Sequence, residues 1–207
     1  MSEFPAYFQI GFEHITDPNG YDHILFVVVL CAIYTLRDWK RVLVLVTAFT
    51  IGHSLTLAVA TLGLVSYRQD VIELLIPVTI LATALVNMAR PESRSRWDDS
   101  RKRDGLRYLL ALGFGLIHGL GFSGYLRLLL GEEASLWQPL LAFNLGLEAG
   151  QLLIVTVLLV LAFLVIDVSR APKYKWNYIV SGVAAGMALS LIINNSLFKE
   201  TAAGFFQ

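Results

Sequence analysis

Long apolar runs separated by short polar breaks dominate the sequence. Runs of this length are typical of transmembrane helices, which need about 20 apolar residues to cross a hydrocarbon core about 30 Å thick. We predict six membrane segments: Tyr21–Leu36, Val42–Leu62, Val71–Ala89, Leu106–Leu130, Leu136–Val168 and Trp176–Phe198. The pattern therefore predicts an all-α polytopic membrane protein, with about six transmembrane helices in one bundle and a single domain over residues 1–207.

The composition agrees with a bilayer environment. Hydrophobic residues make up 56% of the chain and charged residues 15%, whereas soluble domains carry about a quarter charged residues. The net charge is zero, which gives no general attraction to nucleic acid. The single cysteine, Cys31, excludes a disulfide within the chain and a thiolate-rich metal site. We expect a lipid bilayer around the protein and no nucleic-acid partner; the oligomeric state stays open.

Lysine and arginine are distributed unevenly between the breaks. Twelve of the 16 basic residues fall between segments one and two, three and four, and five and six, and Arg107 at the start of segment four brings the number on that side to 13. The positive-inside rule makes that side cytoplasmic. Because the number of segments is even, both termini are then predicted outside. This topology suggests a bacterial inner (plasma) membrane protein.

A few polar residues interrupt the membrane segments. Ionisable side chains near the bilayer centre cost at least about 2.5–3.5 kcal/mol each, so they face protein or water and are candidates for function. The ionisable members are Asp22, His23, His53, Glu73, His118 and Glu148, and the amides are Asn87, Asn144 and Gln151. A single buried histidine can also be only an interhelical hydrogen-bond donor, and Asn87, near the cytoplasmic end, is expected to be structural.

Counting along the helices places several of these groups at one depth. His53 follows Arg41 by twelve residues and His118 follows Arg107 by eleven, which puts both roughly 16–18 Å above the cytoplasmic edge at 1.5 Å per residue. Glu148 lies a similar distance below Trp137. We therefore expect a polar layer near the bilayer midplane.

The first segment is short and begins inside this layer. His23 precedes Arg37 by fourteen residues, or about 21 Å of helix. The turn Pro18-Asn19-Gly20 prevents the helix from extending backward. The turn is therefore predicted to dip into the membrane, where protein or a water-filled cavity must cover its backbone. His14 precedes this turn and is expected in a loop.

Spacing within the helices favours convergence on one site. Asn144, Glu148 and Gln151 share one helix face. Thr50 offers a hydroxyl beside His53, and Glu73 lies near the outer interface. Gly115 and Gly119 flank His118 and form a step that allows two helices to approach closely. We expect Asn144, Gln151, Glu73 and Thr50 to surround the site rather than to bind an ion directly.

Imidazoles with one or two carboxylates and no thiolate suit Zn²⁺, Ni²⁺, Co²⁺ or Fe²⁺. We predict that His23, His53 and His118 are ligands and that Asp22 either binds the ion or orients a ligand. Glu148 is the next candidate, and His14 is placed to cap the site from its loop. Neutral imidazoles bind metal, so binding is expected to weaken in acid.

Five ordered blocks carry a family resemblance: HITDPNGYDHILF, TAFTIGHSLTLA, VIELLIPVTI, FGLIHGLGF and FNLGLEAGQ. Together they resemble the second branch of the HupE/UreJ family of small membrane proteins. The resemblance implies a nickel or cobalt permease that is accessory to nickel enzymes. It selects these positions: His14, Asp22, His23, His53, Glu73, His118, Asn144, Glu148 and Gln151. Seven residues separate His14 from Asp22 here, against five in that family's His-x5-Asp-His signature.

Three functions remain open from the sequence. The first is transport or handling of a divalent metal (Ni, Co or Zn) through a His/carboxylate site in the outer half of the bilayer. The alternative is a membrane-embedded hydrolase with a metal-bound water; Glu148 or Asp22 would be its base, and Ser54 or Ser123 would bind substrate. The third is an assembly factor with a static metal site.

Overall fold

The computed structural model describes residues 3–89, 97–130 and 136–205. Within these ranges the chain is helical and contains no strand, which confirms the all-α prediction. The elements are α1 (Phe4–Thr16), α2 (Tyr21–Cys31), a 3-10 turn η1 (Leu36–Asp38), α3 (Trp39–Thr61), α4 (Gln69–Ala89), α5 (Trp97–Leu130), α6 (Trp137–Phe163), a π-helical turn η2 (Leu164–Val168), α7 (Lys173–Asn194) and α8 (Ser196–Phe205).

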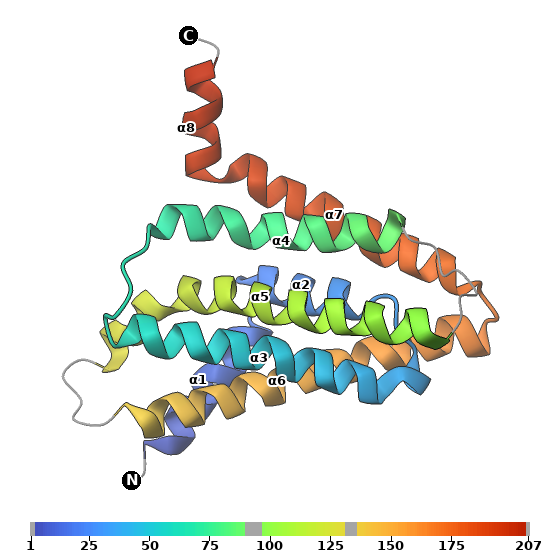
Figure 1. Cartoon of the computed structure of the whole chain (residues 1–207), viewed down its shortest axis with the longest axis horizontal. Helices are drawn as coiled ribbons and strands as arrows, with labels where there is room; N and C mark the ends of the chain where they lie inside the picture. Colours follow the sequence, from blue (N-terminus) through green and yellow to red (C-terminus); the bar gives the residue numbers. More distant parts are fainter. Residues whose placement is uncertain (1–2, 90–96, 131–135, 206–207) are drawn as a thin grey trace.

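Five of these helices, α3 to α7, are long and apolar enough to cross a membrane. They lie along the long axis of the bundle (Figure 1). We call the end of the bundle that carries residues 36–41 and 170–175 the basic end. The segment 62–68, the start of α1 and the end of α7 all lie at the opposite end (Figure 1).

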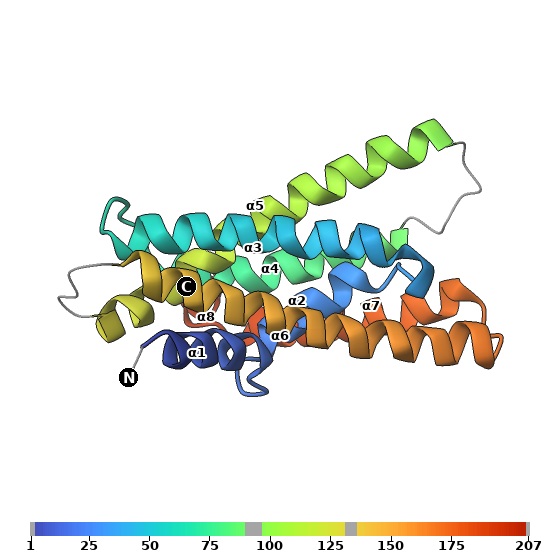
Figure 2. The same cartoon turned by 90° about the horizontal axis from the view of Figure 1, so that it is seen from below.

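Helices α1 and α2 are each too short to cross a bilayer. Their 13 and 11 residues correspond to about 20 Å and 17 Å of helix. Figure 2 shows α1 beside the half of α6 that is nearer the opposite end, with α2 continuing from mid-bundle toward the basic end. The two helices together thus extend over the length of one long helix, with a break in the middle.

Local chemistry explains the break. Pro18 cannot continue the hydrogen-bond ladder of α1. The Asp17 carboxylate accepts hydrogen bonds from the backbone N–H of Asn19 (2.8 Å) and from its side-chain amide (3.0 Å). An aspartate that bonds two residues ahead in this way forms a tight turn. The chain therefore leaves α1 and enters α2 within four residues.

Helix α2 ends at Cys31, whereas the sequence predicted a helical segment up to Leu36. The reason is a competing helix start at Thr35. The Asp38 carboxylate accepts hydrogen bonds from the backbone N–H of Thr35 (3.2 Å) and from its hydroxyl (2.9 Å). This reciprocal arrangement of Thr and an acid three residues later begins a new helix, so the chain turns before η1 and α3.

Glycines allow two pairs of helices to approach at backbone distance. A Cβ atom on Gly115 would stand 2.2 Å from the Phe49 carbonyl oxygen, and one on Gly119 would stand 2.3 Å from the His53 carbonyl oxygen. Helices α3 and α5 therefore pack with no side chain between them, as small-xxx-small steps permit. In α6, a Cβ on Gly146 would stand 1.9 Å from the Phe8 carbonyl oxygen, so α1 lies equally close to α6.

Asn87 ties three helices together. Its side-chain amide donates to the Val29 carbonyl (2.7 Å), and its own carbonyl accepts from the Asn177 amide (2.8 Å). These bonds join α4 to α2 and α7. Asn87 thus has the structural position that the sequence suggested.

Candidate metal centre

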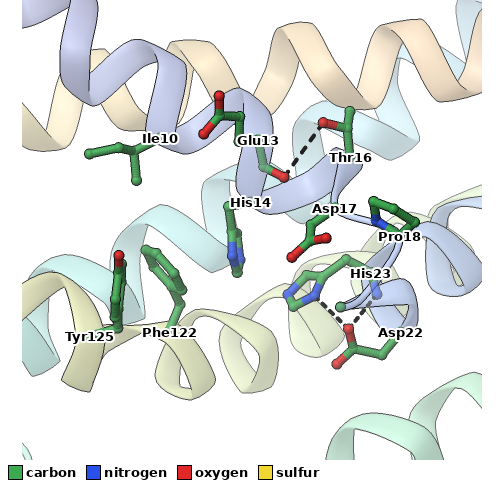
Figure 3. A pocket seen from close by; sticks show the side chains of 11 residues that line it. Ile10, Glu13, His14, Thr16, Asp17, Pro18, Asp22, His23, Phe122 and Tyr125 are labelled. Carbon is green, nitrogen blue, oxygen red and sulfur yellow. Dashed lines mark hydrogen bonds and ion pairs between the residues drawn. The ribbon is translucent and has the colours of Figure 1, made fainter.

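Three histidines from three helices converge at the break between α1 and α2. His14, His23 and His53 each offer a ring nitrogen, and these atoms lie within 4.8 Å of one another. His53 is fully buried and His23 is 7% exposed. His14, expected in a loop, lies instead in the last turn of α1. A helical position fixes the direction of its side chain, which points toward His23 and α5 (Figure 3).

The ring nitrogens of this trio are short of hydrogen-bond partners. Among the described residues, His14 Nε2, His23 Nε2 and both nitrogens of His53 are buried and make no hydrogen bond. Buried polar atoms are nearly always paired, and leaving one unpaired costs about 1–3 kcal/mol. Several such atoms at one point indicate a ligand that supplies the missing partner.

Asp22 orients His23. Its Oδ1 atom lies 3.0 Å from His23 Nδ1 and also accepts the backbone N–H of His23 at 2.9 Å. An ionised carboxylate only accepts hydrogen bonds, so His23 Nδ1 carries the ring proton. The lone pair of His23 is then on Nε2, which is buried and makes no hydrogen bond among the described residues. A carboxylate behind a ligating histidine is the usual arrangement around protein-bound metals.

A pocket of about 600 Å³ adjoins the trio. It is bounded by α1, the turn 17–20, the first turn of α2 and α5 (Figure 3). Three carboxylates, those of Glu13, Asp17 and Asp22, are part of its lining, and no lysine or arginine is. Such a lining attracts cations. Because α2 begins only at mid-bundle, the pocket fills space that an unbroken helix would occupy.

His118 lies beside the trio on its basic-end side. Its ring centroid is 5.2 Å from that of His23, 4.7 Å from that of Phe26 and 5.3 Å from that of Phe49. The side chain is fully buried. The structure thus brings all four histidines into one connected group, with His14, His23 and His53 as its most compact part.

The predicted face of α6 points toward α3. Gln151 is fully buried and accepts a hydrogen bond from the Thr50 hydroxyl (2.7 Å). Glu148 is half-buried and accepts one from the Thr47 hydroxyl (3.0 Å). The Asn144 amide donates to the Leu140 carbonyl (2.8 Å). Glu148 therefore lies at the seam between α3 and α6, outside the histidine trio that the structure assembles.

Comparison with known families identifies the family of the chain. The sequence matches the family described as HupE / UreJ protein over residues 1–196. The chain belongs to the HupE/UreJ family. No curated protein and no solved structure matches it. Five apolar helices and this membership make it an integral membrane protein.

Other residues selected from the sequence do not line the pocket beside the HupE/UreJ histidine group. Glu73 is exposed and accepts a hydrogen bond from the Gln69 amide at 3.3 Å. The Ser54 hydroxyl donates to the Thr50 carbonyl (2.7 Å), and Ser123 is hydrogen bonded to Tyr67 and to the Leu120 carbonyl. None of these three side chains is part of the pocket lining.

Two hydroxyl side chains near the site make contacts that the sequence did not predict. Thr79 contacts His118, with 3.3 Å between Thr79 Oγ1 and His118 Nε2, and Thr47 contacts Glu148. From the sequence, Thr79 was only a possible relay group in the cytoplasmic half, and Thr47 was not selected. A hydroxyl in an apolar helix usually bonds to its own backbone, so the sequence alone does not predict these contacts. Only the packing of α4 on α5 and of α3 on α6 reveals them.

Proposed function

We propose that this HupE/UreJ protein takes up a divalent transition metal, Ni²⁺, Co²⁺ or Zn²⁺, as its substrate. The observation that carries the proposal is the trio His14, His23 and His53, whose buried ring nitrogens lack partners in the described part of the chain and of which His14 and His23 line an acidic pocket. Imidazole nitrogens bind these borderline metals well. The family resemblance independently implies nickel or cobalt.

The broken helix supports transport. Transporters commonly place their substrate site near the midplane, between the halves of a discontinuous helix. Here the break between α1 and α2 lies directly at the trio. The ion would enter past Glu13 and Asp17, exchange its water for imidazole at the trio, and meet His118 next on its way toward the basic end.

Polar groups continue from the trio toward the basic end. Thr50 and Gln151 form one hydrogen-bonded pair between α3 and α6, and Thr47 and Glu148 form a second. Both threonines precede His53 on α3, so they lie nearer the basic end. These pairs offer oxygen atoms to an ion that leaves the histidines, with Glu148 as the one carboxylate among them. We propose this seam as the second half of the route.

We also propose the membrane orientation. The basic end faces the cytoplasm by the positive-inside rule, so the acidic pocket opens toward the outer side of a bacterial plasma membrane. With α1 and α2 counted as one broken crossing, the chain crosses six times and has both termini outside. The pocket would then collect metal from the outer compartment.

A metal-dependent hydrolase at the same site has less support. Three imidazoles would leave a position open for water on Zn²⁺. However, the Asp22 carboxylate is bonded to His23, and the Glu148 carboxylate to Thr47. Each carboxylate is therefore already engaged through one of its oxygens. A hydrolase would also leave the break between α1 and α2 without a role.

Metal uptake into proteoliposomes tests the proposal. Purified protein should bind about one equivalent of Ni²⁺ or Co²⁺, and liposomes that contain it should accumulate the ion. His53→Ala removes a fully buried ligand and should abolish both activities. Glu73→Gln, an exposed position that does not line the pocket, is the matched control and should retain both. Binding without uptake in the wild type would overturn transport and leave a static metal site or a hydrolase.

A further inference from the structure

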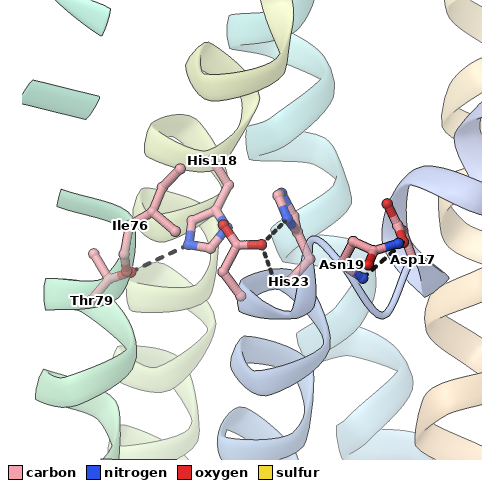
Figure 4. A network of polar contacts seen from close by, with 7 residues as sticks. Asp17, Asn19, His23, Ile76, Thr79 and His118 are labelled. Atoms are coloured by element: carbon pink, nitrogen blue, oxygen red, sulfur yellow. Dashed lines mark hydrogen bonds and ion pairs between the residues drawn. The ribbon is translucent and has the colours of Figure 1, made fainter. Parts of the chain in front are cut away.

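His118 contacts the hydroxyl of a threonine on a neighbouring helix. Its Nε2 atom lies 3.3 Å from the hydroxyl oxygen of Thr79 in α4 (Figure 4). Both side chains are buried, with Thr79 5% exposed and His118 fully enclosed.

The single proton of the Thr79 hydroxyl is already used. Thr79 Oγ1 donates to the Ile76 carbonyl oxygen at 2.7 Å, one turn back on α4 (Figure 4). A hydroxyl has one proton to donate and two lone pairs. Toward His118 it can therefore only accept, so His118 Nε2 must carry the ring hydrogen.

The other ring nitrogen of His118, Nδ1, then carries no hydrogen and has a free lone pair. Nδ1 is buried and has no hydrogen-bond partner in the described part of the chain. A metal ligand needs a neutral ring with one free nitrogen, and a hydrogen bond to the other nitrogen fixes which atom that is. His23 is fixed in the opposite sense, with its hydrogen on Nδ1 beside Asp22.

We propose that Thr79 is a positioning residue that holds His118 in its Nε2–H tautomer, so that Nδ1 is the atom offered to the metal. The claim that His118 Nδ1 binds the metal rests on the proposed function. The claim that Thr79 fixes the tautomer of His118 does not. The two histidines thus present different ring nitrogens, each selected by its partner: Nε2 of His23 by Asp22, and Nδ1 of His118 by Thr79.

Nitrogen NMR on metal-free protein with ¹⁵N-labelled histidine tests the tautomer. The His118 signals are assigned from their loss in His118→Gln. Wild type should show hydrogen on Nε2, Thr79→Val should show a mixture of tautomers, and Thr79→Ser should restore the wild-type pattern. Thr83→Val, one turn along α4 where the hydroxyl bonds only to the Thr79 carbonyl, is the matched control and should change nothing. Hydrogen on Nδ1 in wild type, or an unchanged Thr79→Val spectrum, would overturn the proposal.

Ni²⁺ titration of the same variants tests whether His118 binds the metal. Thr79→Val should weaken binding roughly 10-fold, as loss of a partner behind a ligand usually does, and should alter the ligand-field absorption of bound Co²⁺. Thr79→Ser should recover both. Wild-type affinity in His118→Ala would show that His118 is no ligand. If the wild type binds no metal, the proposed function fails, while the metal-free spectra still decide the role of Thr79.

Discussion

At the scale of single residues, the site is organised by hydrogen-bond direction. Asp22 accepts from His23 Nδ1, and Thr79 accepts from His118 Nε2. These partners come from the first turn of α2 and from α4, so rigid helices hold them. His53 has no partner on either ring nitrogen among the described side chains. It is therefore the histidine whose orientation depends most on the ion.

Replacing Asp22 by Asn should weaken metal binding by about 10- to 100-fold, because an amide retains the shape but loses the charge that supports His23. A competition titration with a chromophoric chelator measures the affinity. Glu73→Gln is the control, since Glu73 is exposed and does not line the pocket. Equal affinities for the two variants would contradict the orienting role of Asp22.

Acid should release the metal. An imidazole binds metal only when neutral, and its ordinary pKa is about 6.5. At a site with three or four histidines, bound metal and protons compete for the same nitrogens. The apparent affinity should thus fall as the pH is lowered, because protons then displace the metal from the ring nitrogens. Titrations carried down to the lowest pH at which the protein stays folded, with proton counting, measure this; metal that stays bound without any proton uptake at the acid end would contradict imidazole ligation.

At the scale of helices, glycine contacts determine where the histidines lie. Gly115 and Gly119 of α5 contact the backbone of α3 on both sides of His53. His118, between them in the sequence, is brought to the histidine group by the same packing. The distance between α3 and α5 therefore sets the distance between His53 and His118.

Gly119→Ala should separate α3 from α5, because the new Cβ would stand 2.3 Å from the His53 carbonyl oxygen and 2.4 Å from the Thr56 hydroxyl. Overpacking of this kind costs about 1–3 kcal/mol. We expect a lower melting temperature in detergent and weaker metal binding. Gly113→Ala is the matched control on the same helix, where a Cβ meets nothing within 4 Å. Equal losses in both variants would contradict the role of close packing.

Counting along the helices predicted which histidines lie at one level of the bundle, but not which side chains meet there. Helical rise is fixed, so counting back from Arg37 predicted a turn partway along the bundle, and the break between α1 and α2 lies there (Figure 2). Rotation is not fixed by counting, and Glu148 proves to face Thr47 at the seam of α3 and α6. His14 was hard to place because seven residues separate it from Asp22. The tight turn at Asp17 absorbs the extra length, which only tertiary structure shows.

At the scale of the whole molecule, the two ends of the bundle differ in charge and in closure. The acidic pocket lies between α1 and α5, on the side of the trio away from the basic end. At the basic end, Asp104 pairs with Arg41 at 3.5 Å and lies 3.9 Å from Arg107, and the Arg107 guanidinium lies over the Tyr34 ring. These contacts join α3, α5 and the segment after α2. The proposed transporter would therefore be open toward the outer side and closed at its cytoplasmic end.

Labelling of introduced cysteines should reveal this orientation and the number of crossings. The one native cysteine, Cys31, is 1% exposed, so it should not react with a membrane-impermeant maleimide. In intact cells the reagent should label Glu3→Cys and Ser66→Cys, which are exposed positions at the opposite end. Lys175→Cys, exposed at the basic end, should react only after the membrane is opened. If Glu3→Cys behaves like Lys175→Cys, then α1 and α2 do not form one broken crossing, and the acidic pocket does not open outward.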